Sequence, residues 1–154
     1  MGLTADSIER EVLIEAPQQR VWDLITQPEH LEKWWASAGA EVDLRVGGHL
    51  TMKFKHEGME GPYVCLIEEV DEPRAFAVRW APWAGGAPVE PGNSTHIQFT
   101  LTAEGDATRL TVVESGFSEL DYSDADVKEH FESNVNGWGV VLDSLNKLAG
   151  GVPA

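Results

Sequence analysis

The chain has 154 residues, which suits one ordinary domain and is short for two. Its 11 basic and 26 acidic side chains give a formal net charge of −15 at pH 7, while 42% hydrophobic residues are typical of a globular protein. A field of that sign repels phosphate backbones and anionic headgroups, so the charge argues against nucleic-acid binding and against acidic membrane surfaces.

The first predicted element is a strand over residues 7–15, where apolar and acidic side chains alternate. Pro17 suits the first position of a helix, because the N–H that proline lacks would be unpaired there. Apolar residues at helical spacing follow it, and a second short helix is predicted from Glu29 to Trp34 or Trp35. The chain therefore opens with one strand and two short helices.

After these helices the apolar period changes to two, which predicts antiparallel strands joined by turns at Gly47–Gly48 and Gly58–Pro62. The expected strands cover residues 50–54, 63–70, 75–80, 95–103 and 108–117. The segment 81–94 is rich in Gly and Pro and is the longest irregular piece. Its Trp83, beside Gly85 and Gly86, predicts either a surface loop held down by one tryptophan or a mobile lid.

A long amphipathic helix is predicted at about residues 125–149, with Ser123 or Asp124 as its cap. Apolar residues recur in it at spacings of three and four: Phe131, Val135, Trp138, Leu142 and Leu145. A sheet of short strands must bury that stripe. We therefore expect an α+β fold in which a curved antiparallel sheet of about six strands wraps around the C-terminal helix, with two short helices after the first strand.

Several segments add a resemblance to a known family. They are IEREVLIEAPQQRVWDLITQPEHLEKWW, DLRVGGHLTMKF, EEVDEPRAFAVRW, TRLTVVESGF and NGWGVVLDSLNKL. In order and spacing they resemble the helix-grip fold of the START-like, polyketide-cyclase-like (SRPBCC) superfamily. Within it they are similar to the branch named for activator of heat-shock-protein-90 ATPase homologue 1. The resemblance spans Ser7 to Leu148 and implies one START-like domain over residues 1–154, with its core at about 7–149.

Members of that superfamily bind apolar small molecules between sheet and helix, and a minority are enzymes. The resemblance therefore implies a pocket lined by apolar and aromatic side chains, which we expect to be Met52, Phe54, Tyr63, Trp80, Phe99, Phe131, Val135 and Trp138. The alternative is that these aromatics pack as core. For Trp138, that alternative makes Gly137 a small residue that lets the helix approach the sheet.

Glu114 is the candidate polar group of this site. Counting by twos from Leu110 and Val112 places it on their inward face, where a carboxylate needs a partner or a raised pKa. It could then anchor a ligand or act as a general base. The alternative is a glutamate near the end of a strand that reaches solvent, because Ser115–Gly116 follows.

No metal site or cofactor is expected. His49 and His56 are seven positions apart and so fall on opposite faces of a strand, while His30, His96 and His130 belong to separate elements. Three aspartates near residue 124 lack the pattern of a calcium loop, and Gly47–Gly48 lacks that of a phosphate loop. The single cysteine, Cys65, excludes an internal disulfide and fits a small buried residue.

The N-terminal residues lack the apolar run of a secretory signal, and no apolar segment is long enough to span a bilayer. We therefore expect a soluble cytoplasmic protein of undetermined oligomeric state. Three functions stay open: binding of an apolar or amphipathic molecule such as a lipid, isoprenoid or polyketide; a cyclase, aromatase or hydrolase that uses Glu114, Tyr63 or a histidine; and a chaperone-cofactor or stress-response role with a protein partner. The first is preferred, because no acid–base pair can be identified.

Overall fold

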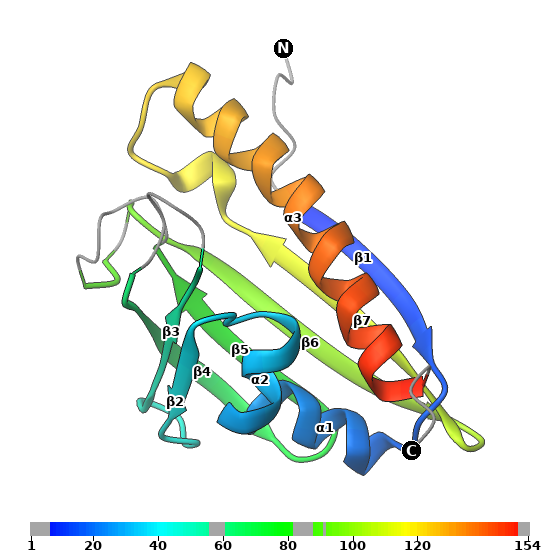
Figure 1. The fold of residues 1–154 in the computed structure, drawn as a ribbon. Coiled ribbons are helices and arrows are strands. Elements are labelled where there is room, and N and C mark those ends of the chain that lie inside the picture. Colours follow the sequence, from blue (N-terminus) through cyan, green and yellow to red (C-terminus); the bar gives the residue numbers. More distant parts are fainter. Residues whose placement is uncertain (1–6, 56–60, 82–87, 91, 151–154) are drawn as a thin grey trace.

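A seven-stranded antiparallel sheet frames the molecule, as the computed structural model shows for residues 7–55, 61–81, 88–90 and 92–150 (Figure 1). Its strand order is β1-β7-β6-β5-β4-β3-β2. The strands are β1 (Ser7–Ile14), β2 (Gly39–Val42), β3 (His49–Lys53), β4 (Tyr63–Asp71), β5 (Ala75–Trp80), β6 (Thr95–Glu104) and β7 (Ala107–Ser115). The α+β helix-grip prediction is confirmed, with seven strands in place of about six. His56, Trp83, Gly85, Gly86 and most of the turn predicted at Gly58–Pro62 lie outside the described residues.

The strand that the sequence pattern did not predict is β2. Its four residues show no alternation of buried and exposed side chains, so the periodicity carries no strand signal there. It forms because it pairs with β3 along the edge of the sheet, where Ala40 lies opposite Met52. Pairing with a neighbour, and not local preference, therefore sets this strand.

Two short helices, α1 (Gln18–Thr26) and α2 (Pro28–Trp34), cover one end of the sheet (Figure 1). Pro17 is the residue before α1, one position earlier than predicted, whereas Pro28 is the first residue of α2. A short 3-10 helix, η1 (Phe117–Glu119), follows β7 and leads to α3 (Asp124–Gly150). The Ser123 hydroxyl accepts a hydrogen bond of 3.1 Å from the Asp126 N–H, which confirms Ser123 as the cap.

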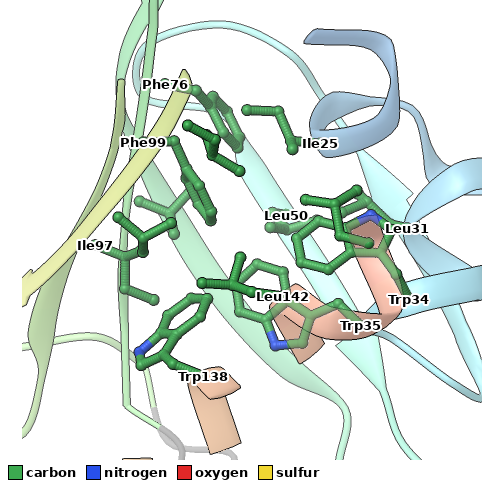
Figure 2. Close-up of a cluster of buried hydrophobic side chains, with 14 of the residues drawn as sticks. Ile25, Leu31, Trp34, Trp35, Leu50, Phe76, Ile97, Phe99, Trp138 and Leu142 are labelled. Atoms are coloured by element: carbon green, nitrogen blue, oxygen red, sulfur yellow. The ribbon is translucent and has the colours of Figure 1, made fainter. Parts of the chain in front are cut away.

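The long helix α3 lies along the inner side of the sheet (Figure 1). Apolar side chains from the sheet, α2 and α3 meet between them, and Figure 2 shows this cluster. Leu142 and Leu145 of α3 are buried there, as are Ile97 and Phe99 of β6. The apolar residues that recur at helical spacing in α3 and those that alternate along the strands thus pack in one core, which fixes α3 against the sheet.

Candidate functional site

Glu114 is a fully buried carboxylate on the inner face of the sheet. Along β7 the buried positions alternate, so Leu110, Val112 and Glu114 all point the same way. The strand stays regular to its end, with Glu114 opposite Ile97 on β6 and Ile8 on β1. The side chain therefore points inward and does not reach solvent.

Four side chains from three elements, β5, β6 and α3, donate hydrogen bonds to this carboxylate. Oε1 accepts the indole N–H of Trp138 at 2.8 Å, and Oε2 accepts that of Trp80 at 2.8 Å. The Thr95 hydroxyl donates to Oε2 at 2.6 Å. The Asn134 amide nitrogen lies 3.0 Å from each of the two oxygens. We call these five residues the Glu114 cluster.

The donor set of the cluster matches an ionised carboxylate. An indole N–H can only donate, and a deprotonated carboxylate can only accept, so every contact is satisfied without a proton on Glu114. All four donors are uncharged, and no ion pair with Glu114 is formed among the described residues. A carboxylate removed from water without a cation costs several kcal/mol, which these hydrogen bonds must offset.

Aromatic rings surround the cluster. Trp35, directly after α2, has its ring centroid 5.5 Å from that of Trp138, 5.6 Å from that of Trp80 and 6.0 Å from that of Phe99. Trp34 stacks on its other side at 5.5 Å, and Figure 2 shows Trp35 between Trp34 and Trp138. The apolar wall that meets Glu114 is thus contributed by the sheet, α3 and the end of α2.

The eight apolar residues predicted to line the pocket divide by exposure. Met52 and Phe99 are fully buried, and Tyr63, Trp80 and Trp138 nearly so. The half-buried ones are Phe54, Phe131 and Val135. Phe54 lies against Tyr63, with centroids 5.7 Å apart, and Phe131 lies against Phe117 at 5.1 Å. Trp80 and Trp138 both donate their indole N–H to the Glu114 carboxylate.

Sequence reasoning missed three contributors to this region: Trp35, Thr95 and Asn134. Asn134 lies four residues before Trp138, which puts both on one face of a helix, so spacing alone could have indicated it. Thr95 faces inward beside Trp80, its partner across the strands. The close-approach reason for Gly137 is wrong, because it is exposed and an added Cβ would meet nothing within 4 Å.

His96 and Cys65 do not belong to the Glu114 cluster. His96 is bonded through Nδ1 to Glu68 at 2.7 Å, on the face of the sheet away from Glu114. In the part of the chain that the structure describes, no three His, Cys, Asp or Glu side chains gather to hold a metal ion. Cys65 is buried, and burial raises the pKa of its thiol to about 12, which leaves it protonated and unreactive near neutral pH.

Comparison with known proteins supports this fold. The model of the family described as "Activator of Hsp90 ATPase homolog 1-like protein" matches residues 15–150. No curated protein matches the sequence.

Among the described residues, none of the helices combines the length and the apolar character that crossing a membrane requires.

Solved structures of low sequence identity share the architecture. Protein MLL2253 from Mesorhizobium loti is 21% identical with a TM-score of 0.72, covering 92% of this chain and 95% of that one. CalU16 from Micromonospora echinospora is 22% identical with a TM-score of 0.68, covering 96% and 76%. The Aha1 dimer from Colwellia psychrerythraea is 20% identical with a TM-score of 0.68, covering 93% and 95%.

Proposed function

The chain belongs to the Activator of Hsp90 ATPase homolog 1-like family, and from that premise we propose that it binds an apolar or amphipathic small molecule between α3 and the inner face of the sheet. The observation that carries the proposal is the Glu114 cluster. A carboxylate without a cation is an expensive group to place among aromatic rings. Natural proteins break such rules of stability mainly at functional sites.

Asn134 is the donor that a ligand would replace. It is half-buried on α3, next to the half-buried Val135 and one turn after Phe131. Its one nitrogen spans both carboxylate oxygens at 3.0 Å, whereas Trp80, Thr95 and Trp138 each donate to one oxygen over 2.6–2.8 Å. A ligand hydroxyl or amine can take its place while the two indoles and the threonine keep their bonds.

The ligand class follows from this exchange. The incoming group must donate a hydrogen bond to a carboxylate, so a neutral hydroxyl or an amine fits, and a second carboxylate would be repelled. The aromatic wall requires an apolar body, which flat rings or isoprenoid chains supply. The protein's net charge of −15 acts in the same direction, disfavouring anions.

The cluster supports binding in preference to catalysis. The hydrogen-bond partners of Glu114 in the described structure are two tryptophans, a threonine and an asparagine, none of which ionises near neutral pH. General acid–base chemistry needs a second group that takes or returns the proton. We therefore assign Glu114 the role of an anchor.

Two variants test the proposal with 2-naphthol, a neutral apolar probe with one hydroxyl, by calorimetric titration. Glu114→Gln should weaken binding about 10- to 100-fold, because a hydrogen bond to a charged group contributes about 1.5–3 kcal/mol. Glu9→Gln, at an exposed position on the adjacent strand, is the matched control and should leave the affinity unchanged.

The second variant is Asn134→Ala, which removes the competing donor. Affinity for 2-naphthol should rise severalfold, whereas a merely structural role for Asn134 predicts a loss. Equal affinities in wild type and in folded Glu114→Gln would refute the anchor role.

A further inference from the structure

The outer face of the sheet carries a hollow of about 280 Å³. It is lined by His49, Val64, Leu66, Pro88 and Val89. The lining residues of β3 and β4 alternate with buried ones, so they lie on the opposite face of the sheet from Glu114. This outer hollow is therefore separate in space from the Glu114 cluster.

Hydrogen bonds order both the floor of the hollow and the segment opposite it. His49 of β3 lies opposite Leu66 of β4 in the ladder, which fixes its floor. The opposite wall, at Pro88 and Val89, is held by Asn93. The amide nitrogen of Asn93 donates to the Pro88 carbonyl at 2.9 Å, and its amide oxygen accepts the Glu90 N–H at 2.8 Å. The hollow is thus bounded by two paired strands and by a segment in which internal hydrogen bonds join Asn93 to Pro88 and Glu90.

Its floor is unusually apolar for the outer face of an antiparallel sheet. Val64 and Leu66 occupy successive outward positions of β4, where alternation normally places polar residues. Val64 is 40% exposed and Leu66 is half-buried, so both retain surface that a ligand could cover. Burying that surface is favourable, at about 25 cal/mol per Å² before ordering costs.

One polar group faces this apolar floor. The His49 side chain is exposed and forms no hydrogen bond within the described structure. None of the described residues that line the hollow is acidic, although the chain carries 26 acidic side chains. Glu68, further along β4, is occupied by Arg79 at 3.4 Å and by His96 at 2.7 Å. An anion in the hollow would thus have the His49 imidazole beside it and no carboxylate among the lining residues that the structure describes.

We propose that the outer hollow is a second binding site, for a small apolar molecule that carries a carboxylate. His49 donates a hydrogen bond to the carboxylate, and Val64, Leu66 and Val89 cover the apolar body. The volume lies just below the usual range of about 300–1,000 Å³ for ligand pockets, which limits the body to one or two rings. This preference is the reverse of the one at Glu114, so the two sites are separable by charge.

The test is an NMR titration of isotope-labelled protein with 2-naphthoate. Saturable shifts are expected at the amides of His49, Leu66 and Val89. Val64→Arg fills the hollow and should abolish these shifts. Val140→Arg, the same change at a 68% exposed valine on α3, should leave them intact. His49→Ala should weaken binding at least fivefold, and His49→Gln, which keeps a donor, should restore most of it.

Two results would overturn the proposal. One is that 2-naphthoate produces saturable shifts around Glu114 and none in the outer hollow. The other is that Val64→Arg, with its dispersed spectrum intact, binds 2-naphthoate as wild type does. Failure of the 2-naphthol experiments on Glu114 variants leaves these expectations unchanged, because the probes, faces and residues differ.

Discussion

At the scale of single residues, Glu114 and Trp138 act as one unit. The indole N–H of Trp138 donates to Glu114 at 2.8 Å, and its ring packs 6.0 Å from that of Phe99. Removing either side chain leaves the other buried without this hydrogen-bond partner. A buried unsatisfied polar group lowers the free energy of unfolding by about 1–3 kcal/mol. In the described part of the chain, every buried side-chain nitrogen and oxygen currently has a partner.

We predict that Glu114→Gln lowers the free energy of unfolding by about 1–3 kcal/mol, because the new amide turns a donor toward an indole N–H or another donor. Trp138→Phe, which keeps a ring and loses the N–H, should cost a similar amount. Urea denaturation measures both, and Glu9→Gln, at an exposed position, should change stability by less than about 0.5 kcal/mol.

The double variant completes this prediction. Because both changes break one hydrogen-bonded unit, the combined loss should be smaller than the sum of the single losses by at least about 0.5 kcal/mol. Strictly additive losses would mean that the two side chains stabilise the fold independently, contrary to the observed contact.

At the scale of elements, the two halves of α3 are held differently. In the C-terminal half Leu142 and Leu145 are buried, whereas in the N-terminal half Val127 is buried and Phe131 and Val135 are half-buried. Gly137 and Gly139 flank Trp138 between these halves, both exposed, and an added Cβ at either would meet nothing within 4 Å. Neither glycine is required by packing, and each weakens the helix at the junction.

We predict that Gly137→Ala and Gly139→Ala each stabilise the protein by about 0.5–1 kcal/mol, because alanine is the better helix former and has space in both places. If the N-terminal half of α3 moves to admit a ligand, the same variants should slow the association of 2-naphthol. Denaturation and stopped-flow fluorescence measure the two effects. Destabilisation by either alanine would contradict the view that packing leaves both positions free.

At the scale of the whole molecule, periodicity predicted most of the fold. Strands β6 and β7 and the first half of β4 alternate between buried and more exposed residues, and α3 repeats its apolar stripe, so local pattern and tertiary packing agree. The edge strand β2 was not predicted, because its four residues show no alternation of buried and exposed side chains. The apolar pattern of a sequence identifies a helix or strand when one face of that element is buried. It gives no signal for a strand that forms only through pairing with its neighbour.

The site was predictable only in part. Alternation along β7 indicated that Glu114 points inward, since that depends on one strand alone. Its donors come from residues 80, 95, 134 and 138 and converge only through the sheet register and the position of α3. The outer hollow depends likewise on a loop returning to strands β3 and β4. Contacts between elements distant in sequence leave no signal at a single position.

The most direct test of the central claim is to follow the indole N–H signals in the NMR spectrum during a titration with 2-naphthol. We predict that the signals of Trp80 and Trp138 shift together to saturation, because both donate to the carboxylate that receives the ligand hydroxyl. Trp34, whose indole N–H donates to the Leu24 carbonyl at 2.7 Å, is the internal reference and should move little. Saturable binding that leaves the Trp80 and Trp138 signals in place would contradict the claim that Glu114 anchors the ligand.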